Sequence, residues 1–326
     1  MTRFLADCHL HFEGCLPEET VRALAARAGH RFADPAVFQR ARCELRGAAG
    51  FLDLYAEVCR LFRGPDDYFE AGRAVAARFH RDGLAYAEVY VSPEIFSVLG
   101  LSAGECLAAV AGGLEEGQAE GTRCRILLDA VRHWGPESAD RVLDLYERRP
   151  LPAIVGFGLG GDEASYPASA FAGAYLRARS LALRTSVHAG EWAGAESVAD
   201  ALDALRPDRI DHGIAAACDP RVMARLAQEG TVLCVAPSSN RATGAVESLA
   251  AHPLRRMLSA GVRVALAADD PVFFETTTRR EYEVARDALG LTPAERRLCA
   301  ENSWRGAFCT GAEKAAGLAA LAEAEV

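Results

Sequence analysis

The sequence predicts a (β/α)8 TIM barrel, an α/β fold, with a helical lid inserted after the first strand. Eight short apolar segments alternate with long segments rich in Ala, Leu and Arg, which is the pattern of strands and crossover helices. The chain has 326 residues and is 50% hydrophobic, which suits one large core. No GxGxxG sequence follows the first apolar segment, as a dinucleotide-binding sheet would require. We therefore expect one barrel domain over residues 1–326.

The predicted strands are short runs rich in Val, Ile, Leu and aromatic residues. They cover residues 3–11, 85–91, 124–131, 153–160, 184–190, 208–213, 230–237 and 263–269. The connection between the first two is far longer than a crossover needs, so it should carry helices of its own over the barrel mouth. Within it, aromatic and apolar residues recur at helical spacing: Phe51, Tyr55, Val58 and Phe62. They indicate either ordinary helix core or an apolar lid over a flat ligand.

Polar residues stand at the carboxyl ends of four predicted strands. The first strand ends in "DCHLH", and because side chains two apart on a strand point the same way, its two imidazoles share one direction. Such a pair is either satisfied by hydrogen bonds in the core or binds a metal. The other three strands end in His188 and Glu191, in Asp211 and His212, and in Asp269 and Asp270. Active sites of this fold lie at these strand ends, so we expect a catalytic zinc site there, built from nitrogen and oxygen ligands.

Composition excludes several classes of partner. Basic residues number 36 and acidic residues 45, a net charge of -9, so we expect no nucleic acid polymer as partner. The first strand pattern begins at once and no apolar run is long enough to span a bilayer, so we expect no membrane and a cytoplasmic location. The 10 cysteines are scattered without a CxxC pair, which favours buried thiols over disulfides or a four-cysteine zinc site. The partner expected is a small-molecule substrate, and the oligomeric state is left open.

Five motifs in the chain occur in a characteristic order. "HLHFEG", "SVHAGE", "RIDHG", "SSNRATGAV" and "ALAADDP" stand at the predicted strand ends. As a set, over about residues 4 to 285, they resemble the adenosine deaminase family of the amidohydrolase superfamily. The resemblance implies one Zn2+ per chain. Its ligands would be His9, His11, His188 and Asp269.

The resemblance also implies how a 6-aminopurine would be bound and deaminated. Glu191 would donate a proton to purine N1, and His212 would act as base and orient the attacking water. Asp270 would contact N7, and the backbone at Gly161 would contact N3. Displacing ammonia from C6 requires a hydroxide at neutral pH, which zinc supplies, and a proton on the ring, which a non-ligand glutamate supplies in base deaminases.

Three departures from the family pattern concern the substrate. Glu13 stands where adenosine deaminases commonly have an Asp that contacts the sugar, so Glu13 is the expected contact at the sugar end, and His11 is a further expected substrate contact. Gly158 stands where Asp is usual, and Tyr90 where Arg is frequent. "HFEG" and "RIDHG" are more like adenine and aminodeoxyfutalosine deaminases, whereas "SNRATGAV" and "TTTRREY" are more like the nucleoside branch.

The expected function is therefore hydrolytic deamination of adenosine or a 5'-modified adenosine to the 6-oxopurine and ammonia, with free adenine as the second candidate. Two other classes stay open: another metal hydrolase of the superfamily, acting on an amide or ester, and a non-catalytic zinc or nucleoside binding protein. Glu191, together with Asp270 beside the metal ligand, favours the purine over the other hydrolytic substrates, and the complete set of catalytic residues disfavours a binding protein. A simple hydrolysis needs only an activated water and a base, whereas a purine needs a carboxylic acid at its ring nitrogen.

Overall fold

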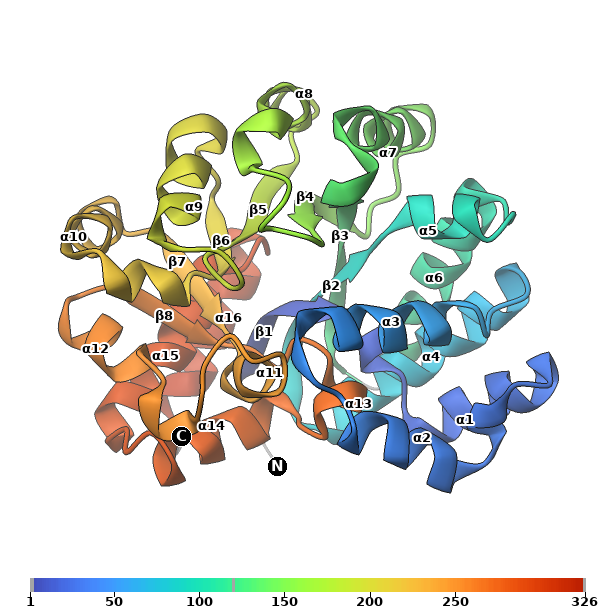
Figure 1. Cartoon of the computed structure of the whole chain (residues 1–326), viewed down its shortest axis with the longest axis horizontal. Coiled ribbons are helices and arrows are strands. Elements are labelled where there is room, and N and C mark those ends of the chain that lie inside the picture. The colour runs from blue at the N-terminus through green and yellow to red at the C-terminus, as the bar shows by residue number, and fades with distance from the viewer. Residues whose placement is uncertain (1–2, 119–120, 325–326) are drawn as a thin grey trace.

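Eight parallel strands follow one another in chain order around the barrel (Figure 1). The computed structural model describes residues 3–118 and 121–324. The strands are β1 (Leu5–His11), β2 (Leu84–Val91), β3 (Arg123–Val131), β4 (Ile154–Gly160), β5 (Arg184–Ala189), β6 (Arg209–His212), β7 (Val232–Val235) and β8 (Arg263–Leu266). Each overlaps its predicted segment, so the predicted fold class is confirmed. The prediction of one domain extends to residues outside this description and stays a prediction.

The residues that follow β8 close the barrel against β1. The backbone N–H of His11 donates to the carbonyl of Asp269 at 3.0 Å, and the N–H of Asp269 donates to the carbonyl of His9 at 3.0 Å. Between β5 and β6, the register places His188 opposite Asp211. Because all the strands are parallel, these carboxyl ends meet at one rim of the barrel.

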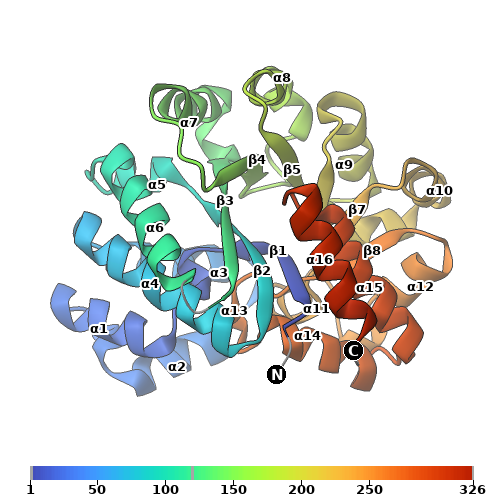
Figure 2. The same cartoon turned by 180° about the vertical axis from the view of Figure 1, so that it is seen from behind.

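Helices surround the strands (Figures 1 and 2). They are α1 (Glu18–Ala28), α2 (Pro35–Cys43), α3 (Gly47–Cys59), α4 (Pro65–Arg81), α5 (Pro93–Val98), α6 (Ala103–Gly117), α7 (Pro136–Arg148), α8 (Ala172–Ser180), α9 (Ala195–Asp200), α10 (Pro220–Glu229), α11 (Pro237–Ala242), α12 (Leu254–Ser259), α13 (Pro271–Phe274), α14 (Thr278–Asp287), α15 (Pro293–Gly306) and α16 (Gly311–Ala322). Their starts are encoded locally. Asp34 and Asp219 cap α2 and α10 through their side chains, and Thr292 and Thr310 form capping boxes on α15 and α16.

The predicted lid is the segment that carries α1, α2 and α3 between β1 and the crossover helix α4. In Figure 1, α3 lies beside β1 and α13. The ring of Phe51 on α3 packs against Phe273 and Phe274 of α13, with centroids 5.9 and 5.2 Å apart. Of the four periodic residues, Phe51 and Tyr55 line a cavity at the mouth of the barrel, whereas Val58 and Phe62 are buried in the core. The lid interpretation therefore applies to Phe51 and Tyr55, and the core interpretation applies to Val58 and Phe62.

The buried side chains of the strands are mainly apolar, as is usual in parallel barrels, and an ion pair between Arg209 and Glu88, 2.6 Å apart, is buried among them. The 10 cysteines are all free and 7 of them are buried, which agrees with the prediction of small core thiols. Within the described ranges, no helix has the length and apolarity needed to cross a bilayer.

Candidate active site

Three imidazoles and one carboxylate converge at the carboxyl rim of the barrel. The Nε2 atoms of His9 and His11 lie 3.3 Å apart, and that of His188 lies 3.0 Å from His9 and 3.2 Å from His11. Asp269 brings its Oδ1 to 3.4 Å from His9 Nε2 and 3.3 Å from His11 Nε2. Residues from β1, β5 and the end of β8 thus form one cluster, although they lie far apart in the sequence.

This donor set fits a divalent metal. Ligand atoms about 2.0–2.1 Å from a zinc ion stand roughly 3 Å from their neighbours, which is the spacing of the three imidazole nitrogens and of Asp269 Oδ1 from His9 and His11. Burial, followed by the neighbouring imidazoles, lowers the pKa of His9 well below its usual value, and burial lowers that of His11 to about 3, so both rings are neutral. Neutral imidazoles with free nitrogen lone pairs are what a metal site needs. The Nδ1 of His188 lies 3.1 Å from the carbonyl of Leu159, which leaves its Nε2 as the ligand atom.

Asp211 lies behind two of these imidazoles. Its Oδ1 is 3.8 Å from His9 Nδ1 and its Oδ2 is 3.8 Å from His188 Nδ1. The same carboxylate accepts hydrogen bonds from the hydroxyls of Tyr90 and Ser186. At these distances the carboxylate makes no hydrogen bond to either ring, and its charge lies beside both imidazoles. The sequence placed Asp211 at a strand end but assigned it no role.

Two of the departures from the family pattern prove to be one structural feature. A Cβ built on Gly158 would lie 2.2 Å from Cε1 of Tyr90, so the tyrosine ring occupies the space where residue 158 would place a side chain. The ring also stacks on His11, with centroids 5.1 Å apart and planes 22° apart. Gly158 is therefore required by Tyr90, and Tyr90 supports both the cluster and Asp211.

We expect Gly158→Ala to destabilise the fold by about 1–3 kcal/mol, because the added methyl overpacks the space against Tyr90. Zinc content should fall with it, since the tyrosine ring and hydroxyl both support the cluster. Thermal melting and elemental analysis measure the two effects. Gly173→Ala is the matched control, because a Cβ there meets nothing within 4 Å. If Gly158→Ala and Gly173→Ala had the same melting temperature and the same zinc content, the requirement of Tyr90 for a glycine at position 158 would be contradicted.

Glu191 lies at the edge of the cluster, in the loop that follows β5. Its Oε2 is 3.4 Å from His212 Nε2. Burial, followed by the negative charge of Asp269, raises the pKa of Glu191 well above its usual value, so the group keeps its proton. A buried carboxylic acid of this kind can serve as a general acid.

The loop that carries Glu191 is held by another glutamate. Glu163, from the loop after β4, accepts hydrogen bonds from the backbone N–H groups of residues 190–193, at 3.0 Å from Glu191 and 2.9 Å from Trp192, and from the hydroxyl of Ser197. Burial would raise the pKa of Glu163, but these hydrogen bonds hold it below its usual value. Sequence reasoning missed this residue. Its only signal was an acidic residue directly after the glycine-rich end of the fourth strand.

A chain of hydrogen bonds fixes the tautomer of His212. The N–H of Leu254 donates to His252 Nδ1 at 3.1 Å, so the proton of His252 is on Nε2, which donates to Asn240 Oδ1 at 3.2 Å. The amide nitrogen of Asn240 then donates to His212 Nδ1 at 3.0 Å. The proton of neutral His212 is therefore on Nε2, which faces the cluster. This tautomer suits the orienting role expected of His212 better than the role of base.

His212 and Asp269 share an uncommon backbone conformation. Both have φ of 62°, in the left-handed region that non-glycine residues seldom adopt. Such positions persist where the surrounding structure fixes them and occur often at functional sites. The conformation turns both side chains from the strand ends into the cluster, where His212 Nε2 lies 3.8 Å from Asp269 Oδ2.

Asp270 and Gly161, the expected contacts to purine N7 and N3, both line the cavity in front of the cluster. Asp270 is 1% exposed and no described residue donates a hydrogen bond to its carboxyl group. Burial and the charge of Asp269 raise its pKa well above the usual value, so it can donate to a ring nitrogen. A Cβ on Gly14 would lie 1.9 Å from Asp270 Oδ1, which explains the glycine of "HFEG".

Glu13 lies in a different environment from the other expected contacts. It is 1% exposed and is absent from the cavity lining, and its Oε2 accepts a 2.6 Å hydrogen bond from the hydroxyl of Tyr55 on the lid. Burial, opposed by this hydrogen bond, raises the pKa of Glu13 to about 6. The carboxylate therefore has a protein partner already. Its contact with a sugar stays a prediction.

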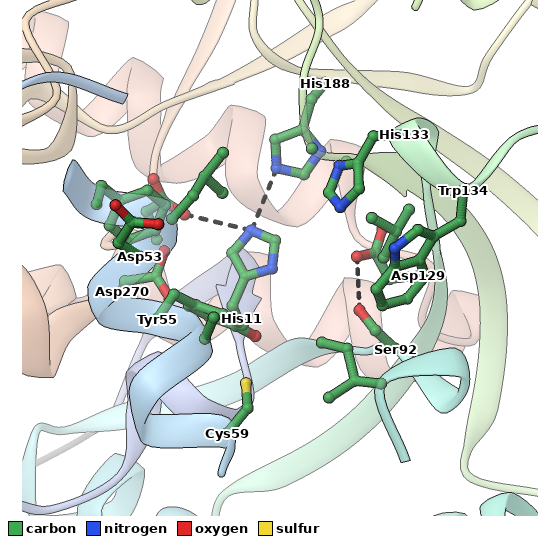
Figure 3. Close-up of a pocket in the computed structure, with 18 of the residues that line it drawn as sticks. His11, Asp53, Tyr55, Cys59, Ser92, Asp129, His133, Trp134, His188 and Asp270 are labelled. Atoms are coloured by element: carbon green, nitrogen blue, oxygen red, sulfur yellow. Dashed lines mark hydrogen bonds and ion pairs between the residues drawn. The ribbon is translucent and has the colours of Figure 1, made fainter. Parts of the chain in front are cut away.

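The cavity in front of the cluster has a volume of about 410 Å³, which is the size of a small-molecule site. Figure 3 shows His11 between Asp270 and Tyr55 on one side and Asp129 and Ser92 on the other. Apolar residues of the lid, of α5 with the residue that follows it, and of the segment after β3 also line the cavity: Phe51, Leu52, Ile95, Val98, Leu99 and Trp134. Sequence reasoning missed Asp129 and Ser92.

A (β/α)8 barrel with imidazole and carboxylate groups at the carboxyl rim, and a buried acid beside them, has the donor set of the metal-dependent hydrolases of the amidohydrolase type. The chain belongs to the adenosine deaminase family, because the family model described as adenosine deaminase matches residues 5–324. It is an enzyme of the purine aminohydrolase class.

Individual relatives agree with this assignment. The chain is 38% identical to the adenine deaminase of Rhizobium meliloti (strain 1021) over 293 residues, which cover 89% of each chain. Its structure is similar to that of an adenine deaminase from Arthrobacter aurescens, with a TM-score of 0.92 and 32% identity over 99% of both chains. It is also similar to an amidohydrolase from Burkhoderia ambifaria with bound Zn, with a TM-score of 0.87 and 26% identity over 98% of this chain and 89% of that one.

Proposed function

We propose that this enzyme deaminates a 6-aminopurine by hydrolysis and that free adenine is its preferred substrate, giving hypoxanthine and ammonia. The observation that carries the reaction is the buried Glu191, 3.4 Å from His212 and beside the cluster of three imidazoles and Asp269, where burial raises its pKa. The adenine deaminase relatives at 38% and 32% identity support the free base. The bond between Tyr55 and Glu13 also supports it, because the carboxylate expected to bind a sugar already has a partner.

We further propose one zinc ion per chain, held by His9, His11, His188 and Asp269. The spacing of their ligand atoms and the neutral imidazoles support this choice. When bound, zinc supplies a water activated for attack at neutral pH.

The side chains around the cavity then act on the purine ring. Addition of the water oxygen at C6 moves an electron pair onto N1, and Glu191 donates its proton to that atom. His212, with its proton on Nε2, holds the attacking oxygen in place. Asp270 donates to N7, and the backbone at Gly161 bonds N3. The attacking water returns one proton to Glu191, and its other proton passes to the amino nitrogen, which leaves C6 as ammonia, so one water is consumed and the acid is restored.

A nucleoside, adenosine or a 5'-modified adenosine, is the second candidate. The cavity of about 410 Å³ favours it, since the apolar outer wall extends well beyond the cluster. In this case Tyr55 would have to release Glu13 so that the carboxylate could bond a ribose hydroxyl. The position of the Tyr55 side chain would therefore determine which of the two substrates the site prefers.

The test is a substrate panel followed by the loss of ultraviolet absorbance. Adenine, adenosine, deoxyadenosine, methylthioadenosine and aminodeoxyfutalosine are compared by kcat/KM with zinc-loaded enzyme. We expect kcat/KM for adenine to exceed that for every nucleoside by at least about a hundredfold. A site that hydrogen-bonds a particular group of its substrate rejects analogues in which that group is absent. If a nucleoside were deaminated faster than adenine, the nucleoside would become the preferred substrate and adenine the second candidate. No turnover of any member, at full zinc occupancy, would defeat the proposed reaction.

A further inference from the structure

A second buried acid faces the cavity, opposite Asp270, and has no role in the proposed deamination steps. Asp129 of β3 is 5% exposed and lines the cavity. Its Oδ2 accepts a 2.8 Å hydrogen bond from the hydroxyl of Ser92, whereas its Oδ1 is buried without a partner. It forms no ion pair with a described residue. A buried carboxylate oxygen without a donor is costly, so it needs a donor from whatever occupies the cavity.

The position of Asp129 identifies the donor. The pairing of β3 with β4 sets Val131 opposite Gly160, and Asp129, two residues earlier, shares the side-chain direction of Val131. Both oxygens of Asp129 would lie 3.5 Å from a Cβ on Gly160, directly before Gly161. Asp129 and Gly161 are therefore neighbours on one side of the cavity. Figure 3 shows Asp270 on the other side of His11.

A purine ring matches this arrangement of groups. Its N7 lies on one edge, whereas N3 and N9 lie together on the opposite edge. If Asp270 bonds N7 and Gly161 bonds N3, the edge beside Asp129 carries N9. In free adenine that nitrogen bears a hydrogen when N7 does not, and N9–H is then a donor. In a nucleoside the same nitrogen is bonded to ribose and has no hydrogen to donate.

We propose that Asp129, positioned by Ser92, accepts a hydrogen bond from the N9–H group of a free purine base and thereby makes the site select bases over nucleosides. The inference rests on the proposed deamination at this site. Substitution at N9 leaves the buried oxygen of Asp129 without its hydrogen-bond donor, and this loss adds to any steric conflict with the lid. An unpaired buried acceptor is a strong source of discrimination.

The first experiment uses the unmodified enzyme with adenine and 9-methyladenine. The analogue lacks the N–H and adds only a methyl group, so it tests the hydrogen bond without a sugar. We expect kcat/KM for adenine to exceed that for 9-methyladenine by at least about a hundredfold. Calorimetric Kd values for hypoxanthine and 9-methylhypoxanthine should differ in the same direction, which gives a readout independent of turnover. Equal values for each pair would overturn the proposal.

The second experiment uses Asp129→Asn, which keeps the shape of the side chain and removes its charge. Efficiency on adenine should fall about 10–100-fold, whereas efficiency on 9-methyladenine should change less than about threefold. Ser92→Ala should reproduce part of the loss, because it removes the donor that holds Asp129. The matched control is Asp140→Asn on the exposed surface of α7, outside the cavity, which should leave the ratio of the two substrates unchanged.

The outcomes separate this inference from the proposed function. Equal losses on adenine and 9-methyladenine would make Asp129 a structural residue, and a larger loss on adenosine would make it a ribose contact. Either result overturns the inference and leaves adenine deamination intact. If zinc-loaded wild-type enzyme deaminates no purine, the proposed function fails first. If Asp129→Asn does not fold, the comparison of substrates with wild-type enzyme still decides.

Discussion

Replacing Glu191 by Gln should lower kcat on the preferred 6-aminopurine by about 10²–10⁴-fold, the usual contribution of a general acid. The glutamine amide has nearly the shape of the protonated carboxyl group and can still donate a hydrogen bond to N1. It cannot transfer the proton, so kcat should fall much more than KM changes. Steady-state kinetics on zinc-loaded protein measures the effect. Zinc content should be unchanged, since Glu191 is not among the proposed ligands.

The matched control is Glu196→Gln, which removes an exposed carboxylate a few residues further along the same segment. It should keep near-parental turnover. Folding of both variants is checked by thermal melting, because Glu191 lies at a strand end and supports little of the apolar core. Near-parental turnover by Glu191→Gln would show that another group protonates the ring, and it would weaken the purine assignment together with the role of Glu191.

Removing the metal should abolish activity, and one equivalent of zinc per chain should restore it. The reason is that Glu191 and His212 can supply protons and orientation, but neither can activate water at neutral pH as zinc does. Stripped protein should also melt at a lower temperature, because an ion bound only by the folded state stabilises that state. Elemental analysis and melting curves before and after chelation measure both effects.

Single ligand variants locate the metal. His188→Ala should lose zinc and activity together, since His188 Nε2 lies within 3.0–3.2 Å of the corresponding atoms of His9 and His11. His30→Gln is the control, because that histidine lies outside the cluster and pairs with Glu57. Full activity in protein that holds far less than one zinc, and cannot be loaded further, would contradict the proposed metal chemistry.

The preferred substrate depends on parts of the site that differ from the metal cluster. On the motifs alone, a nucleoside stood first and adenine second. The adenine deaminase relatives and the bond between Tyr55 and Glu13 favour the reverse order. The buried acceptor on Asp129 supplies a physical reason for it. The panel of purines and the 9-methyl analogue address these points independently of the zinc experiments.

The sequence by itself determined the barrel and the approximate location of its polar residues. Apolar runs separated by helical segments predict alternating strands and helices, and the period of two on a strand gives His9 and His11 one direction. Because parallel strands in a closed barrel end at one rim, the residues at their ends could be expected to meet without knowledge of the register. In the structure the Nε2 atoms of the three expected imidazole ligands lie 3.0–3.3 Å apart, and Asp269 Oδ1 lies 3.3–3.4 Å from those of His9 and His11.

Only the tertiary structure decided which side chains support and limit that cluster. Tyr90 and Gly158 each looked like an isolated departure, but the ring of Tyr90 on β2 reaches past β3 and fills the space where a side chain at residue 158 on β4 would lie. Glu163 holds the loop of Glu191, and Leu254 fixes the proton of His212 through two intermediate side chains. These contacts depend on strand register, loop conformation and rotamers over large sequence separations. Local periodicity carries no information about them, because it reports only which face of an element is buried.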